Sequence, residues 1–174
     1  MVNDMNTALL VIDMQNDYLC KNRMKRFAYD TEGLVSSVNR IIHQYIAEGH
    51  DVIYIRHIIQ NLPTNRLLFG YSLAGTEGAA LYSGLDRVSE YVFDKLVGDA
   101  LSNRQLRALI QQKGYGHLYL CGLDECGCVA ATALGAKKRG IEAEIIRDGT
   151  ATVFDVGKAA RTREKLLRAG VRYI

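Results

Sequence analysis

Residues 118–133 read LYLCGLDECGCVAATA, an apolar run that stops at Gly122 and a run of small residues that begins at Cys128. A continuous apolar run is typical of a strand buried on both faces, and the small residues after it predict a helix. A cysteine in the first turn of a helix lies near unpartnered backbone N–H groups and the positive end of the helix dipole. Both favour the thiolate, so the sequence indicates a reactive sulfur at Cys128.

The same alternation of strand and helix recurs along the chain. Apolar runs predict strands at residues 8–13, 52–57, 91–95, 117–122, 141–147 and 171–174. Amphipathic runs that end at glycine predict helices at residues 31–49, 101–113, 128–139 and 158–169. Strands joined by right-handed helical crossovers form a parallel sheet. We therefore expect an α/β protein, three-layered and doubly wound, with a mainly parallel sheet of about six strands flanked by helices.

Length and composition are those of one globular domain. The 174 residues, 48% hydrophobic and 24% charged, suffice for one core, so we expect a single domain over residues 1–174. The longest apolar runs, such as residues 8–12, are too short to cross a membrane. The first residues lack the basic start and apolar core of a secretory signal, which leads us to expect a cytoplasmic protein.

The charge balance argues against a nucleic-acid partner, and the cysteine spacing argues against disulfides. A net charge of +3, from 22 basic and 19 acidic residues, is mild, and no stripe of basic and aromatic residues predicts binding to nucleic acid. Three of the four cysteines are clustered instead of being spread as a disulfide framework, so we interpret all four as reduced thiols.

One long stretch breaks the alternation of strands and helices. Residues 58–89 contain the only proline, Pro63, and four glycines. Loops of this length inside a compact domain are uncommon and usually functional. We expect a functional loop that could cover a site.

Three side chains that can do chemistry follow the ends of three predicted strands: Asp13, Lys95 and Cys128. Alone, the aspartate is typical of a helix cap or loop anchor, and the lysine of a surface residue. Because ligands bind beyond the carboxyl ends of parallel strands, the three together indicate one site. Asp13 could take the thiol proton, Lys95 could hold Asp13 and lower the thiol pKa, and the backbone N–H groups of Asp124 and Cys128 could bind an oxyanion. The sequence thus predicts acyl transfer to water.

At this level of detail the chain resembles the isochorismatase-like cysteine hydrolases, which include nicotinamidases and N-carbamoylsarcosine amidohydrolases. The resemblance rests on residues 8–19, residues 75–79, Lys95 with residues 99–101, and Gly122 with residues 128–133, in the family's order and spacing. It implies the isochorismatase-like hydrolase fold, an Asp13, Lys95 and Cys128 triad, a thioester intermediate and a small amide, ureido or imine substrate. It also implies a cis peptide between Leu123 and Asp124 and assembly into a homodimer or homotetramer.

Two features depart from the family pattern. Asp124 and Glu125 stand where the family has small or hydroxylated residues, and acids beside the nucleophile oppose thiolate formation. We expect their side chains to turn toward solvent; the alternatives are a cationic substrate group or a different activity. Nicotinamidases hold a metal through an Asp-x-His pair and a further histidine, but only His57 is present in that region. We therefore expect no catalytic metal and no cofactor.

Several assignments stay open. The Cys121, Cys126 and Cys128 cluster could bind a soft metal or cycle as a redox pair; otherwise Cys121 is a small buried hydrophobe and Cys126 modulates or protects Cys128. Aromatic side chains of Tyr18, Phe27 and Tyr71 could line a pocket or pack under their loops, and His57 could be a pocket wall or a structural residue.

Two functions from different classes follow from the sequence. The leading hypothesis is a cysteine hydrolase that cleaves a C–N bond of a small molecule. The alternative is a catalytically silent protein of the same fold that binds a metabolite or a partner.

Overall fold

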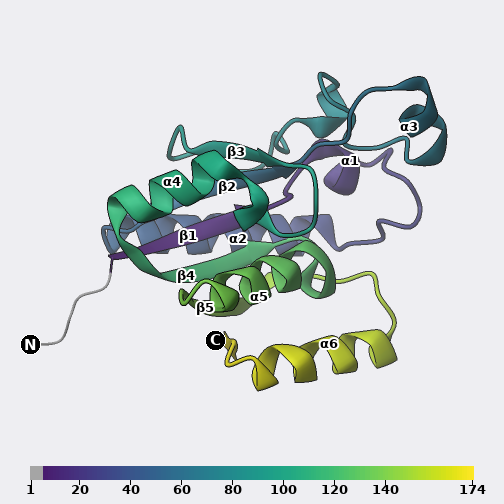
Figure 1. Cartoon of the computed structure of the whole chain (residues 1–174). Coiled ribbons are helices and arrows are strands. Elements are labelled where there is room, and N and C mark those ends of the chain that lie inside the picture. Colours follow the sequence, from purple (N-terminus) through teal and green to yellow (C-terminus); the bar gives the residue numbers. More distant parts are fainter. Residues whose placement is uncertain (1–5) are drawn as a thin grey trace, which may run out of the picture.

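The computed structural model describes residues 6–174 and contains one six-stranded parallel sheet (Figure 1). The strands lie in the order β3-β2-β1-β4-β5-β6, and every neighbouring pair is parallel. Chain connections run outward in opposite directions from β1 and β4, so the predicted doubly wound fold is confirmed. The strand bounds are β1 (Asn6–Ile12), β2 (Asp51–His57), β3 (Val92–Lys95), β4 (Tyr115–Gly122), β5 (Glu142–Thr150) and β6 (Arg172–Tyr173).

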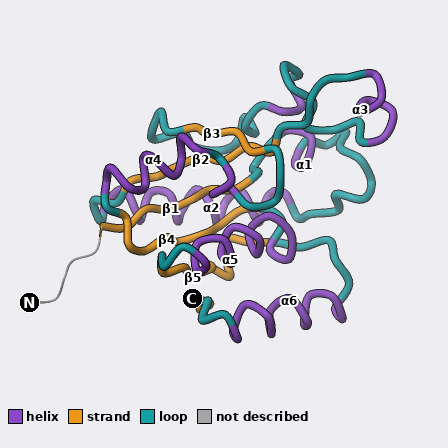
Figure 2. Tube along the Cα trace, viewed as in Figure 1, coloured by secondary structure: helices purple, strands orange, loops and turns teal. Residues whose placement is uncertain are grey.

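Helices cover both faces of this sheet (Figures 1 and 2). Capping side chains begin three of them: Asp30 accepts from Gly33 N, Asn103 from Leu106 N, and Asp155 from Lys158 N. The helices are α1 (Asn16–Leu19), α2 (Thr31–Ala47), α3 (Pro63–Leu68), α4 (Arg104–Lys113), α5 (Ala130–Lys138) and α6 (Val156–Arg168), with short 3₁₀ turns η1 (Glu77–Ala79) and η2 (Ala100–Ser102).

Strand β1 divides the core into two halves because its side chains alternate between the two faces of the sheet. Leu10 and Ile12 pack in the half that contains Leu106 of α4 and residues of α5. Leu9 and Val11 pack in the other half, against α2. The first strand is therefore buried on both faces, as its continuous apolar run predicts.

Several element bounds differ from the prediction. The helix expected at residues 128–139 begins at Ala130, after a π-type turn, η3 (Glu125–Val129), in which Gly127 has non-helical angles (φ −111°, ψ −107°). Residues 58–89 are not one loop, since α3 and η1 form inside the stretch. An isolated β-bridge between Ile59 and Leu73 also joins two segments of this stretch. None of the helices between residues 6 and 174 combines the length and the apolarity that crossing a membrane requires.

The sheet changes winding direction between β1 and β4, and the chain is tightest there. Gly122 pairs with Ile12 and has a φ of +103°, and a Cβ atom on it would lie 2.1 Å from the Ile12 carbonyl oxygen. Only glycine fits a backbone approach this close. Asp13 and the turn that carries Cys128 therefore leave two adjacent strands at the crevice where ligands bind in such sheets.

Candidate active site

The structure brings Asp13, Lys95 and Cys128 together. Asp13 follows β1, Lys95 is the last residue of β3, and Cys128 lies in η3 after β4. Lys95 Nζ donates to Asp13 Oδ2 at 2.8 Å and to Cys128 Sγ at 3.1 Å. One ammonium group thus bridges the carboxylate and the sulfur, although the three residues come from distant parts of the chain.

The carboxylate and the ammonium group of this cluster are buried. Lys95 is 1% exposed and Asp13 is 3% exposed. Burial lowers the pKa of Lys95, but the nearby charges of Asp13 and Cys128 outweigh it and raise that pKa above its usual value. The lysine therefore stays charged. Asp13 Oδ1 is buried and has no hydrogen-bond partner among residues 6–174, so this oxygen is free to accept a proton.

The resting sulfur differs from the sequence prediction. Burial, together with the negative charge of Asp13, raises the pKa of Cys128 to about 12, although Lys95 acts in the opposite direction. A preformed thiolate, as predicted from the helix start, is therefore not favoured. The sulfur keeps its proton until a nearby base removes it, and Asp13 is the carboxylate whose charge acts on it.

The backbone around Asp13 is fixed by hydrogen bonds to neighbouring loops. Asp13 has a φ of 54°, and its N–H donates to Ile55 O at 2.9 Å. Gln15 is fully buried, and its amide accepts from His57 N and donates to the carbonyl oxygens of His57 and Ala79. This glutamine ties β2 and η1 to the end of β1, a role that we did not predict.

The turn between β4 and α5 presents two N–H groups. Its peptide between Leu123 and Asp124 is cis, as the family resemblance implies. Four other N–H groups of the turn have acceptors. Glu125 N donates to Ala151 O, and Cys126 N donates to Asp124 Oδ1. Gly127 N and Val129 N both donate to Asp124 O. Among residues 6–174, no acceptor outside the turn receives a hydrogen bond from Asp124 N–H or Cys128 N–H. These two groups are the predicted donors to an oxyanion.

The prediction that the acidic side chains of this turn face solvent is wrong. The Asp124 carboxylate accepts from Tyr29 OH at 2.9 Å, Thr152 Oγ1 at 2.7 Å, Val153 N at 2.9 Å and Cys126 N at 2.9 Å. The turn and the loop after β5 wrap around this carboxylate, so hydrogen bonding competes successfully with hydration.

Glu125 is buried as well, at 5% exposed. Both of its oxygens accept from Arg163 of α6 at 2.7 Å, and Tyr173 OH also donates to it. The Arg163 hydrogen bonds hold the pKa of Glu125 below its usual value against the opposing effect of burial. Glu125 therefore forms an ion pair with α6 and does not act on the sulfur as a free charge.

A cavity of about 200 Å³ opens onto Cys128. The four side chains predicted for a pocket all line it: Tyr18, Phe27, His57 and Tyr71. The rings of Tyr18 and Phe27 meet edge to face, with centroids 4.8 Å apart, and Tyr18 OH and Ser72 Oγ are hydrogen-bonded at 2.8 Å. The aromatic wall is thus held in place by the loop that follows α3.

Other lining residues were missed by the sequence reasoning: Tyr29, Leu123, Gly127, Val153 and Phe154. Val153 and Phe154 follow the end of β5, so the rule that places ligands beyond the carboxyl ends of strands could have identified them. Tyr29 precedes the cap of α2, and no sequence signal connects it with Asp124.

Among residues 6–174, His57 is the histidine that lies beside Asp13 and Cys128. One ligand atom each from Asp13, His57 and Cys128 lies within 4.8 Å of the others, which is the only such group of metal-ligating side chains among residues 6–174. The group does not fit a resident cation, because the Lys95 ammonium already contacts Asp13 and would repel it. Burial and the Lys95 charge lower the pKa of His57, so its ring is neutral at pH 7.

The other cysteines stand apart from this group. Cys121 is fully buried in β4, and burial raises its pKa far above the usual value. It is the small buried hydrophobe that the sequence suggests. Cys126 is also buried, and the cluster of three cysteines forms no metal-ligating group within the described residues.

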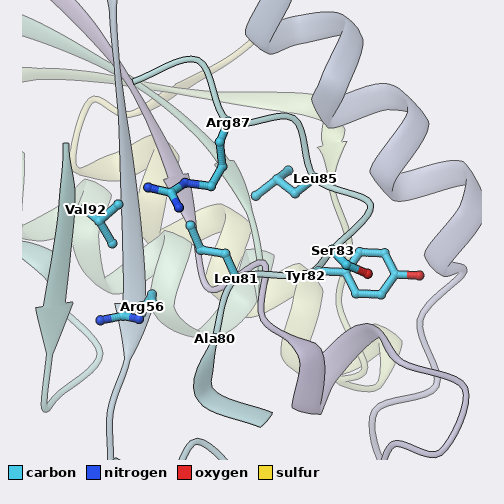
Figure 3. Close-up of a pocket in the computed structure, with 8 residues that line it drawn as sticks. All are labelled: Arg56, Ala80, Leu81, Tyr82, Ser83, Leu85, Arg87 and Val92. Atoms are coloured by element: carbon cyan, nitrogen blue, oxygen red, sulfur yellow. The ribbon is translucent and has the colours of Figure 1, made fainter. Parts of the chain in front are cut away.

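A larger hollow, of about 470 Å³, lies on the β2 and β3 side of the molecule (Figure 3). Its lining carries two arginines, Arg56 and Arg87, but neither a cysteine nor an acid. Arg56 is held by Asp94 in a bidentate ion pair. The smaller cavity at Cys128 is therefore the candidate active site.

Comparisons with solved structures show the same fold. Pyrazinamidase of Pyrococcus horikoshii in complex with zinc superposes with a TM-score of 0.82 at 23% identity, over 97% of this chain and 98% of that chain. N-carbamoylsarcosine amidase of Thermoplasma acidophilum also gives 0.82, at 22% identity over 97% and 95% of the two chains.

Sequence comparisons agree. YddQ of Bacillus subtilis, an uncharacterised isochorismatase family protein, is 27% identical over 149 residues, which is 85% of this chain and 79% of the relative. A probable inactive nicotinamidase of Arabidopsis thaliana is 27% identical over 148 residues, 75% of this chain and 72% of the relative. The family model of the isochorismatase domain matches residues 7–167. Because this match spans nearly the whole chain, the protein belongs to the isochorismatase family.

Proposed function

We propose that this protein is a metal-independent cysteine hydrolase that cleaves a C–N bond of a small amide or ureido compound through a thioester on Cys128. One observation carries the proposal: Lys95 Nζ contacts both Asp13 Oδ2 and Cys128 Sγ beside a cavity of about 200 Å³. Nucleophile, base and a cation that orients both are the groups that covalent acyl transfer requires.

The first half of the reaction forms the thioester. As Cys128 Sγ attacks the substrate carbonyl carbon, its proton passes to the unpartnered oxygen of Asp13. The carbonyl oxygen becomes an oxyanion and accepts hydrogen bonds from the N–H groups of Asp124 and Cys128. The tetrahedral intermediate collapses, the C–N bond breaks, and the amine leaves with the proton that Asp13 carried.

The second half hydrolyses the thioester. Asp13 takes a proton from water, and the resulting hydroxide attacks the thioester carbonyl carbon. The C–S bond breaks, the acid is released, and the proton held by Asp13 returns to the sulfur. Throughout, the Lys95 ammonium limits the cost of charge on Asp13 and on Cys128, because it contacts both in a buried site.

A screen for ammonia release over small primary amides and ureido acids tests the proposal. We expect at least one compound to be hydrolysed by the native protein and by Cys126→Ala, but not by Cys128→Ala. Cys126 is a matched control because it lies in the same turn without lining the cavity. Equal turnover by Cys128→Ala would refute the thioester route.

A catalytically silent binding protein is the second candidate, and the name of the Arabidopsis relative motivates it. Alkylation followed by intact mass spectrometry separates the two. In an enzyme of the proposed type, Asp13 removes the thiol proton as the sulfur attacks the reagent, so Cys128 labels first although its resting pKa is raised. Labelling is slower in Lys95→Ala, because the lysine lowers that pKa. Equal and slow labelling of all four cysteines would favour the silent protein.

A further inference from the structure

The side chains around the active-site cavity carry an unequal set of charges. Two acidic residues, Asp13 and Asp124, line it, whereas no lysine or arginine within residues 6–174 does. Lys95 contacts Asp13 at 2.8 Å, so that pair is neutral as a unit. His57 is neutral at pH 7 because its pKa is lowered. The remaining formal charge in the lining is the negative charge of Asp124.

Hydrogen bonds hold the Asp124 carboxylate in place without cancelling its charge. Its four donors are two backbone N–H groups and the hydroxyl groups of Tyr29 and Thr152, all of them neutral. Four donors, from the turn, Tyr29 and the loop after β5, hold this carboxylate in one position. A substrate in the cavity therefore experiences a fixed negative charge.

The nearest cations are engaged elsewhere. Arg163 is bound to Glu125 through both of its oxygens. Arg26 lies over the rings of Phe27 and Tyr71, and Lys158 lies over the ring of Phe154. All three cations are outside the cavity lining, so apart from Lys95, which is paired with Asp13, an anionic group on the substrate meets no side-chain cation there among residues 6–174.

From this arrangement we propose that Asp124 is a specificity-determining residue, which rejects substrates with a carboxylate or phosphate and favours a small amide whose non-reacting end is uncharged or positively charged. A buried anion without a counter-charge costs far more free energy than a neutral group of the same size. Aromatic faces attract cations, and Tyr18 and Tyr29 line the cavity with no cation over either ring among residues 6–174. The inference rests on the proposed function, but its test measures alkylation of Cys128 and does not require substrate turnover.

Alkylating reagents of different charge measure this selectivity at Cys128 directly. Iodoacetamide is neutral, iodoacetate is an anion of nearly the same size, and 2-bromoethylammonium is a cation. We expect the rate ratio of iodoacetamide to iodoacetate at Cys128, divided by the ratio for free cysteine, to be at least about tenfold. The corrected rate for 2-bromoethylammonium should be no lower than that for iodoacetamide.

Two variants attribute the selectivity to the charge of Asp124. Asp124→Asn should bring the ratio of iodoacetamide to iodoacetate close to that of free cysteine. If this variant fails to fold, Val153→Lys adds a cation to the lining at a side chain that is 38% exposed, and should lower the ratio. Glu90→Gln is the matched control, since it removes a carboxylate that is 97% exposed and lies before the start of β3, whereas the cavity lies beyond the carboxyl ends of the strands.

Equal corrected rates for iodoacetate and iodoacetamide in the native protein would overturn the inference. So would an unchanged ratio in Val153→Lys, or an equal change in Glu90→Gln. If Cys128 shows this charge selectivity but the protein hydrolyses no amide, the proposed function is refuted and the inference about Asp124 is supported.

Discussion

Replacing Arg163 by alanine should destabilise the protein, because it removes the partner of a buried carboxylate. Glu125 lies within the turn that carries the candidate nucleophile, and its side chain is 6% exposed. Arg163→Ala removes two charge-assisted hydrogen bonds of 2.7 Å and leaves Tyr173 OH as the remaining side-chain donor to Glu125. A buried carboxylate that loses its cation keeps most of its desolvation cost.

The expected loss lies between the values for surface and buried ion pairs. Exposed pairs contribute about 0.2–1 kcal/mol, whereas breaking a buried pair costs about 3–5 kcal/mol. Arg163 is 43% exposed, so solvent screens part of the interaction. We therefore expect a loss of about 2 kcal/mol in the free energy of unfolding, or about 4–8 °C in Tm for a chain of this size.

The effect should depend on pH in a defined direction. The pKa of Glu125 in the folded protein lies below its unfolded value, so its ion pair adds stability above the unfolded pKa. That stability is lost as the pH falls through the lowered pKa of the folded state. The Tm difference between native protein and Arg163→Ala should thus be full at pH 7 and should shrink below about pH 4.5.

Thermal unfolding followed by circular dichroism between pH 3.5 and 7.5 measures this difference. Arg161→Ala is the control, because Arg161 lies on the same helix and is exposed. It should change Tm by no more than about 1–2 °C. A Tm loss in Arg163→Ala that equals the loss in Arg161→Ala, or one that grows as the pH falls, would refute the reasoning about Glu125.

Three further predictions concern the crevice. Gly122→Ala places a Cβ atom 2.1 Å from the Ile12 carbonyl oxygen, so urea denaturation should show a loss of more than about 3 kcal/mol; a loss below 1 kcal/mol would contradict the close approach. Asp13→Asn should slow hydrolysis about 10²–10⁴-fold yet shift the pH profile of Cys128 alkylation downward, since the Asp13 charge raises the thiol pKa; an upward shift would oppose this electrostatic account. Dialysis against a chelator should leave hydrolysis unchanged because Lys95 contacts Asp13 at the position a cation would need; loss of activity restored by zinc would disprove metal independence.

The positions of the strands along the chain were predictable because parallel strands in a doubly wound sheet are continuous apolar runs. The expected runs at residues 8–13 and 52–57 correspond closely to β1 and β2. Helix starts were less predictable, since local hydrogen bonding sets them. The glycine at position 127 and the carboxylate of Asp124 produce a π-type turn where a regular helix start was expected.

The proximity of Asp13, Lys95 and Cys128 was also predictable, because each lies at or after the carboxyl end of a strand that faces the crevice. Their environment was not. The thiol pKa depends on burial and on the Asp13 charge, both of which come from packing between segments distant in sequence. Likewise, Arg163 and Tyr173 reach Glu125 from 38 and 48 residues away, so no local pattern identifies them as its partners.

In the proposed reaction the acyl group of the substrate becomes bonded to Cys128 Sγ. The protein is mixed with an amide that it hydrolyses and is quenched rapidly in acid. Peptide mass spectrometry then shows whether the acyl group is bonded to Cys128. We expect the peptide that contains Cys128 to gain the mass of the acyl group and to lose it on treatment with hydroxylamine. Asp13→Asn should accumulate less of the acylated peptide. If Cys128→Ala hydrolyses the same amide at the native rate and no acylated peptide forms, the reaction does not proceed through a thioester on Cys128.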